Sequence, residues 1–554
     1  MVRYAVAGWL AGLLTMRFLV PGVEVRTSLS RLWKPCASSG TSSWRCCVPE
    51  TLSRRQEVKV ATGRDQALKD MFSSLSVLQN SYFDGVNGTW PSTIEWTGAV
   101  VQTVMSATLS SLTKTLDSPL YDSRARDNLI STLYSQVTQS FFSQDVDGIK
   151  GQVRFSDRQR GTDLSLAHTA EQAYDDMLWV VLGWLEAIKF VRLHAALHYP
   201  GKPDKDCNKL PGQINMALQT LPWHGYGWTC SFAQRAREFW LVAAEGWDTS
   251  LCSGGMVWNP RLEPYKNTIT NELWIAASIG LYEQLPGTGV NGSHVEDRLD
   301  WANGNPVWLA ASIVGYKWLK AVNMTNEQGL FVDGYHISRR RRRNRKCDDR
   351  DETVYTYNQG VILSGQRGLW AATGAGTFLD DGHALVQSVI AATGWDLNRG
   401  GPVDLTPGRL PPARGLGRGG ILEETCDVDG SCSQDAQTFK GIFFHHLAAF
   451  CTPVEAESLA TAARPMEMKA QARDHIRSCR SYLDWMRHNM MAALATRDSH
   501  GRFGMWWGAG AFGLDALVDQ DVVRRAVNSS DYRNRGTPLD AVWSPQRRRP
   551  QHPR

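Results

Sequence analysis

The sequence lacks the patterns that indicate a metal centre or a sheet-based fold. None of its 11 cysteines forms a CxxC pair or stands at ligand spacing with histidine, which argues against a zinc site. His445-His446 has no carboxylate or cysteine at such a spacing either, so we interpret both as ordinary helix residues. Strand-like alternation of apolar and polar residues is scarce. The chain is therefore expected to be helical and to hold no metal.

Basic residues are not spread over the chain as a nucleic-acid surface requires. The net charge of +5 depends on two segments without acids, Arg339–Lys346 and Trp543–Arg554. Without their cations the remaining chain is mildly acidic, whereas a nucleic-acid face carries basic residues on its folded elements. We exclude nucleic acid as a partner and interpret the arginine run as a solvated loop between helices.

The first apolar run is too short to span a bilayer alone. Arg3 precedes apolar residues from Tyr4 to Leu14, the length of a signal-peptide core, and extension to Val20 would give a weak anchor. Residues 1–25 are therefore predicted to be a signal peptide or weak signal anchor. The cysteines fit an oxidising compartment, and four Asn-x-Ser/Thr sequons predict glycosylation at Asn87, Asn291, Asn323 and Asn528. We expect a protein of the secretory pathway that is secreted or associated with the cell wall or endomembranes.

Long apolar segments with helical spacing dominate the rest of the chain. Met177–Leu197 is nearly all apolar apart from Glu186, Lys189 and Arg192, which form one narrow polar stripe. This pattern predicts a helix buried on most sides. Ala-Ala-Thr-Gly occurs at 371–374 and again at 391–394, where each glycine predicts a left-handed helix end. Further helices are predicted over Leu273–Leu285, Val307–Val322, Gly360–Ala372, Ala384–Ala392 and Phe439–Phe450.

Helices of similar length, separated by loops rich in glycine and aromatic residues, indicate stacked helical hairpins. A toroid of such hairpins leaves a cleft at the end where the loops meet. No linker interrupts residues 64–515, which we interpret as one catalytic domain; residues 26–63 are a low-order N-terminal segment, and residues 516–554 are an Arg/Pro-rich tail. Cys426 and Cys432 are close enough in sequence to close a small loop.

Two adjacent acids, Asp175 and Asp176, stand directly before the most apolar helix. One interpretation is structural, because Asp caps helices and acids favour the positive end of the helix dipole. The other is a carboxylate pair that serves as nucleophile and general acid/base in glycosidic bond cleavage. A magnesium–diphosphate site needs further acids on the same helical face, and none follows until Glu186, so this alternative is weak.

Other polar clusters also stand at loop-to-helix junctions. Their amides, acids, lysines and aromatic rings match the hydroxyl groups and flat faces of a sugar, although each cluster alone would also suit caps and turns. The 22 tryptophans have the same two interpretations, sugar stacking or core. The candidate substrate-binding residues are Trp258, Asn271, Glu272, Tyr357, Asn358, Gln359, Asp435 and Lys440.

These motifs together resemble glycoside hydrolase family 76, the fungal and bacterial endo-α-1,6-mannanases. The resemblance rests on four stretches in one order: Asp175-Asp176-Met177-Leu178-Trp179, Tyr265-Lys266-Asn267 with Asn271-Glu272-Leu273, Tyr357-Asn358-Gln359-Gly360 and Phe439-Lys440-Gly441. Gly246-Trp247-Asp248 and Gly419-Gly420-Ile421-Leu422-Glu423-Glu424 are similar to stretches of the fungal members. The resemblance covers residues 79–507 and departs from the family at the arginine run and at both ends of the chain.

The resemblance implies an all-α (α/α)6 barrel and a retaining mechanism, with Asp175 as nucleophile and Asp176 as acid/base. It implies no metal and no organic cofactor. The expected function is hydrolysis of α-1,6-mannosidic linkages in mannan, with mannan or a mannose-containing oligosaccharide as substrate. Two alternatives remain open: a cell-wall transglycosidase acting on mannose-containing glycans, and an inactive carbohydrate-binding relative. The sequence does not predict the oligomeric state, and membrane or cell-wall association is compatible with it.

Overall fold

The computed structural model describes the predicted catalytic domain with several gaps. Apart from a few further gaps of one or two residues, the described ranges are 63–115, 130–138, 173–199, 228–285, 304–338, 344–454 and 465–512. The predicted signal segment, most of the predicted N-terminal segment, the C-terminal tail, most of the arginine run and the sequons at Asn87, Asn291 and Asn528 lie outside them. The sequon residue Asn323 is described and exposed.

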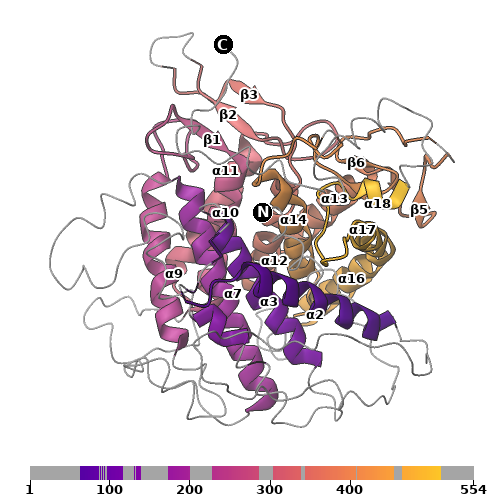
Figure 1. Cartoon of the computed structure of the whole chain (residues 1–554). Helices are drawn as coiled ribbons and strands as arrows, with labels where there is room; N and C mark the ends of the chain where they lie inside the picture. Colours follow the sequence, from indigo (N-terminus) through magenta and orange to yellow (C-terminus); the bar gives the residue numbers. More distant parts are fainter. Residues whose placement is uncertain are drawn as a thin grey trace, which may run out of the picture.

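The described chain is built mainly from α-helices, which confirms the all-α prediction (Figure 1). Every helix predicted above is present, with its ends shifted by up to seven residues. The helices are α2 Gly63–Tyr82, α3 Thr97–Thr115, α7 Tyr174–His198, α9 Thr229–Ala243, α10 Thr268–Gln284, α11 Pro306–Ala321, α12 Val361–Thr373, α13 Thr377–Ala392, α14 Ala436–Phe450, α16 Pro465–Ser481, α17 Leu483–Ala495 and α18 Gly508–Phe512.

Helix ends follow the residue types that the sequence provides. Gly374 ends α12 with φ 72°, and Gly394 follows α13 with φ 78°, so both predicted left-handed glycines are confirmed. The polar stripe of α7 is confirmed as well: Glu186 pairs with Lys189 at 3.2 Å, and Arg192 donates to the side chain of Gln284 on α10. No described helix is long and apolar enough to cross a membrane.

Five buried helices form the inner part of the molecule. Helices α3, α7, α10, α12 and α14 pack each against the next, and α14 also contacts α3. More exposed helices lie outside them: α9 packs on α7, α11 on α10 and α13 on α12. From α7 to α14, consecutive described helices alternate between inner and outer positions, so these inner helices run in the same direction. The arrangement is that of the (α/α)6 barrel which the resemblance implies, with five of its inner helices in the described ranges.

Short strands connect the loops at one end of the helices (Figure 1). The strands β1 Tyr265–Asn267, β2 Gly334–His336 and β3 Asp349–Asp351 form an antiparallel sheet in that order. Two further pairs are β4 Trp395–Asp396 with β5 Gly401–Pro402 and β6 Gly417–Arg418 with β7 Ile421–Leu422. Since β1 leads directly into α10, this end of the barrel carries the N-terminal ends of the inner helices.

Disulfides hold several of the loops in place. Cys426–Cys432 closes the short loop that the sequence predicts, and Cys451–Cys479 joins the end of α14 to α16. Cys252–Cys347 joins the loop before β1 to the segment before β3, residues 95 positions apart. The last of these bonds lies beside the candidate site described next.

Candidate active site

Asp175 and Asp176 lie in the first turn of α7, at the loop-bearing end of the barrel. Ala173 holds the N-cap position, so neither acid is the N-cap residue. Asp175 is half-buried, and Asp176 is only 7% exposed. Each carboxyl group nevertheless accepts from a backbone N–H at this helix start, Asp175 from Asp176 and Asp176 from Ala173. Both also lie at the positive end of the helix dipole, so the structural interpretation holds in part.

Trp258 connects the loop before β1 to the first of these acids. Its indole Nε1 donates a hydrogen bond of 3.1 Å to Oδ2 of Asp175. Its backbone is fixed on both sides, because its carbonyl oxygen accepts from the amide of Tyr174 and its own amide donates to the carbonyl of Tyr265. The structure thus places Trp258 against a predicted catalytic carboxyl, with its ring half-buried.

Two more carboxyl groups interact electrostatically with the pair. Asp435, directly before α14, raises the pKa of Asp176. Asp333, directly before β2, raises that of Asp175. Sequence reasoning identified Asp435 and missed Asp333, whose Val332-Asp333-Gly334 setting contains no helix start or amide cluster. The order of the strands, β1 next to β2, is what brings Asp333 to the site.

The surroundings of Asp175 and Asp176 give them different proton affinities. Burial raises the pKa of Asp175 to about 7, while hydrogen bonds from the Asp176 amide and from Trp258 oppose that rise. Burial, followed by the negative charges of Asp175 and Asp435, raises the pKa of Asp176 well above its usual range. Asp176 is therefore the group that keeps its proton when Asp175 ionises.

The aromatic residues of the site form a nearly continuous series. Tyr357 stacks on Phe439 at 3.9 Å with an interplanar angle of 3°, and Trp96 stacks on Phe439 at 6.5 Å and on Trp179 at 5.3 Å. Tyr357 and Trp96 are half-buried, so part of each ring is open to solvent. Flat rings of this kind suit the apolar faces of sugars.

Several of the predicted substrate-binding residues have polar groups engaged with protein. The Asn271 side chain bonds to the backbone of Met256 and Asn267, and the Gln359 amide bonds to the backbone of Phe331 and Tyr355. Both residues are fully buried. In the structure they fix the loops around the site.

Lys440, Glu272 and Asn358 are fully buried as well. Lys440 forms a 2.7 Å ion pair with buried Asp427. Glu272 lies on α10, and burial raises its pKa well above its usual range. Asn358 points its amide nitrogen toward Asp333, 3.5 Å from Oδ1. Of these three residues, Asn358 is the one that contacts a carboxyl group of the site.

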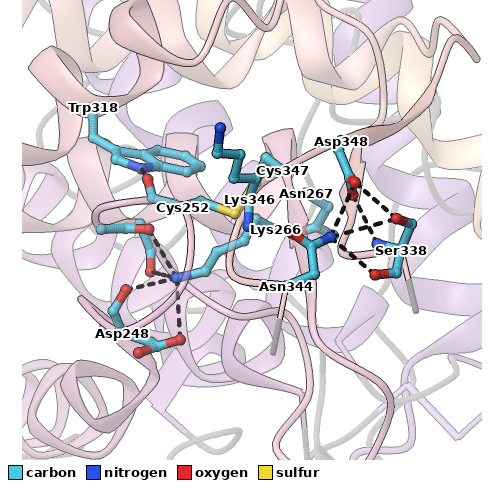
Figure 2. The surroundings of a disulfide bond; sticks show 12 residues. Asp248, Cys252, Lys266, Asn267, Trp318, Ser338, Asn344, Lys346, Cys347 and Asp348 are labelled. Atoms are coloured by element: carbon cyan, nitrogen blue, oxygen red, sulfur yellow. Dashed lines mark hydrogen bonds and ion pairs between the residues drawn. A yellow bond between two sulfur atoms is a disulfide. The ribbon is translucent and has the colours of Figure 1, made fainter. Parts of the chain in front are cut away.

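A buried lysine and a disulfide stabilise the loop that carries Trp258 (Figure 2). Nζ of Lys266 donates to the carbonyl oxygens of Asp248, Gly254 and Gly255, and it lies 3.6 Å from the Asp248 carboxylate. The Cys252–Cys347 bond fixes the middle of the same loop. The position of Trp258 over Asp175 therefore depends on contacts outside the site.

One group of described residues has the spacing of metal ligands. His383, His475 and Cys479 have donor atoms within 4.8 Å of one another. However, the Cys479 sulfur is bonded to Cys451, and the two imidazoles hydrogen-bond to each other at 2.8 Å. The group is thus already engaged, and it lies on α13 and α16, away from the two acids.

Comparison with known proteins gives related sequences. The mannan endo-1,6-alpha-mannosidase DCW1 of Candida glabrata is 27% identical over 214 residues, covering 37% of this chain and 36% of the relative. DCW1 of Saccharomyces cerevisiae is 24% identical over 223 residues, covering 38% and 39%. The matched part thus spans little more than a third of the length of these curated relatives.

A solved structure shows a weaker likeness. Dfg5 from Chaetomium thermophilum, in complex with glucosamine, is 16% identical, with 86% of this chain and 89% of that chain covered and a TM-score of 0.49. The sequence model described as "Glycosyl hydrolase family 76" matches residues 229–511, so Asp175 and Asp176 precede the matched region. As the match covers slightly more than half of the sequence, the chain belongs to glycosyl hydrolase family 76.

Proposed function

We propose that the protein cleaves α-1,6-mannosidic linkages within mannan by a retaining double displacement. The observation that supports this most directly is the pair Asp175–Asp176, two adjacent carboxyl groups with different surroundings at the end of the barrel where the loops meet. Membership of a glycosidase family gives the reaction class, and the names of the matched relatives suggest the linkage. The remaining steps follow from the chemistry of the two acids.

In the first displacement the Asp175 carboxylate attacks the anomeric carbon, and the bond to the leaving oxygen breaks. Asp176 gives its proton to that oxygen, so the leaving sugar departs as an alcohol. The Trp258 N–H and the amide of Asp176 stabilise the ionised form of Asp175 before the attack. The product is a glycosyl ester of Asp175.

In the second displacement Asp176, now ionised, takes a proton from water. The water oxygen attacks the anomeric carbon, the ester bond breaks, and Asp175 is released as a carboxylate. Both acids return to their starting states. A sugar hydroxyl in place of water would give transglycosylation, so incubation with an added acceptor mannoside and analysis of the products distinguishes the two outcomes.

The buried polar residues support this site without needing to touch the substrate. Asn271 and Gln359 hold the loops that carry Trp258 and Tyr357, while Tyr357 and Trp96 are half-buried and open enough to contact sugar. No metal or organic cofactor enters either displacement. The three disulfides between described residues fit an oxidising compartment. We therefore propose that the protein enters the secretory pathway, with exposed Asn323 as a glycosylation site.

The test uses Asp175→Asn and Asp176→Asn. Both variants should lose turnover on linear α-1,6-mannan by about 1000-fold or more while their melting temperatures stay close to that of the wild type. With an activated aryl mannoside, Asp176→Asn should still form the glycosyl-enzyme, and azide should restore its turnover because azide needs no general base.

A matched control is Asp380→Asn, which removes an exposed acid from the first turn of α13 and should change nothing. Near-normal activity of both site variants together with lower thermal stability would refute the assignment. An unmodified protein that binds mannan and releases no reducing ends would instead indicate an inactive binding relative.

A further inference from the structure

The backbone at Asp333 is fixed by residues that belong to other elements. Thr268, at the start of α10, donates its amide to the Asp333 carbonyl at 2.7 Å and its hydroxyl to the Val332 carbonyl at 2.5 Å. The Gln359 side chain bonds to both the amide and the carbonyl of Phe331. The segment before β2 is thus hydrogen-bonded to the residues at the N-terminal ends of α10 and α12. These bonds fix the backbone that carries Asp333 in the absence of a ligand.

The Asp333 carboxyl group has one oxygen engaged and one that retains capacity to accept. The hydroxyl of Tyr265 donates to Oδ2 at 2.6 Å. Among the described side chains, Oδ1 accepts from the Asn358 amide at 3.5 Å, which is a long hydrogen bond. Within the described ranges no cation pairs with this carboxyl group. It is half-buried, so part of it faces solvent.

A chain of contacts connects Asp333 to the proposed nucleophile. Trp258 donates to Asp175 and meets the ring of Tyr265 edge-on, with centroids 6.4 Å apart. Tyr265 in turn donates to Asp333 and stacks on His336 at 4.0 Å. Asp175 and Asp333 also influence each other electrostatically, and both act on Tyr357. A carboxylate with spare acceptor capacity therefore stands at the same site as the two acids.

We propose that Asp333 binds a hydroxyl group of the sugar unit that Asp175 attacks. This inference rests on the proposed function. A carboxylate can only accept, so its partner must be a donor, and a ring hydroxyl is the donor that every mannose unit offers. A charge-assisted bond of this kind is about twice as strong as a neutral one, and it is lost completely when the sugar lacks the hydroxyl. Tyr265 is then a positioning residue, because its hydroxyl orients the carboxylate.

The experiment compares the wild type with Asp333→Asn on activated aryl α-1,6-mannotriosides. In these substrates the unit that bears the aryl group lacks the 2-, 3- or 4-hydroxyl, one in each. On the complete substrate, Asp333→Asn should lower kcat/KM by about 10- to 100-fold, the range for loss of a hydrogen bond to a charged group. On the deoxy substrate that lacks the bound hydroxyl, kcat/KM of the wild type should fall by a similar factor. On that substrate the kcat/KM values of Asp333→Asn and the wild type should agree within about twofold.

Two further variants separate binding from general effects. Tyr265→Phe should lower kcat/KM by a smaller factor, about 3- to 10-fold, and the loss should vanish on the same deoxy substrate. Asp351→Asn removes a half-buried carboxyl group on β3 that acts on Asp333 through its charge alone. Its effect should be the same on all the substrates.

The outcomes distinguish this inference from the proposed function. An active wild type with Asp333→Asn unchanged, or with an equal loss on every deoxy substrate, refutes the role of Asp333 and leaves the function standing. A wild type that neither cleaves nor binds the trioside refutes the function, and the inference fails with it. If Asp333→Asn unfolds, Tyr265→Phe decides the question by the same comparison.

Discussion

Replacing Trp258 with phenylalanine should change the protonation of Asp175 and leave the fold intact. The substitution removes the indole N–H that donates to Oδ2 of Asp175 at 3.1 Å. A phenyl ring keeps the edge-on contact with Tyr265, and the two backbone hydrogen bonds of residue 258 do not depend on its side chain. The main loss is therefore one hydrogen bond to a carboxylate.

The size of the effect follows from that bond. A hydrogen bond to a charged group contributes about 1.5–3 kcal/mol, and one pKa unit corresponds to about 1.4 kcal/mol. Losing the bond should raise the pKa of Asp175 by about 1–2 units, starting from about 7. Because the nucleophile must be ionised, activity should rise with pH through this pKa, and the rising limb should move to higher pH.

The assay is the pH profile of kcat/KM on an activated aryl mannoside. At pH 6 the variant should be about 10- to 100-fold less active than the wild type, and the difference should shrink as pH increases. The profile reports apparent values of the coupled pair Asp175–Asp176, so the shift between the two proteins is the quantity to compare. A loss of the same size at every pH would refute the reasoning, since it would mean that Trp258 acts only by binding sugar.

Trp318→Phe is the matched control. Its indole donates at 3.0 Å to the carbonyl of Cys252, an uncharged acceptor. The same substitution at position 318 should lower the free energy of unfolding by about 1 kcal/mol. It should not shift the pH profile. If the rising limb shifted equally in both variants, the shift would result from destabilisation of the loop and not from the lost hydrogen bond to Asp175.

Two other predictions concern the surroundings of the two acids. Asp435→Asn removes a negative charge that raises the pKa of Asp176, so the falling limb of the pH profile, where the general acid loses its proton, should move to lower pH. An unchanged falling limb would count against Asp176 as the acid. Replacing both Cys252 and Cys347 with serine removes a disulfide that joins residues 95 positions apart in the sequence. It should lower the free energy of unfolding by about 4.7 kcal/mol on chain-entropy grounds, and unfolding in denaturant measures this loss. Because Lys266 still holds the loop, activity of the folded variant should fall less than tenfold; complete inactivity with normal stability would contradict this.

The helices could be predicted because their signals are local. The polar stripe Glu186, Lys189 and Arg192 and the glycines at 374 and 394 each depend on residues within a few turns of the same helix. The pair Asp175–Asp176 could be recognised in the same way, as two acids at a helix start. The structural interpretation of those acids holds in part, because Ala173 is the N-cap while both carboxyl groups accept from backbone N–H groups at the helix start.

The loop clusters were harder to interpret because support and contact use the same residue types. Asn271, Gln359 and Lys440 stand at helix starts beside aromatic residues, as sugar-binding residues would. In the structure their polar groups are turned to the backbone and to Asp427. Whether an amide faces a ligand or a neighbouring loop depends on burial, which the surrounding chain decides.

By itself, the sequence determined the helices, their glycine ends and the acid pair on α7, and it allowed the Cys426–Cys432 loop that the structure closes. Only the tertiary structure decided that Trp258 would donate to Asp175 and that Asp333 would join the site. The reason is physical: local patterns fix the conformation of a segment, but residues far apart in sequence meet only when the inner helices pack side by side. That packing brings their N-terminal loops to one end of the barrel, and there β1 pairs with β2 and carries Asp333 to Tyr265.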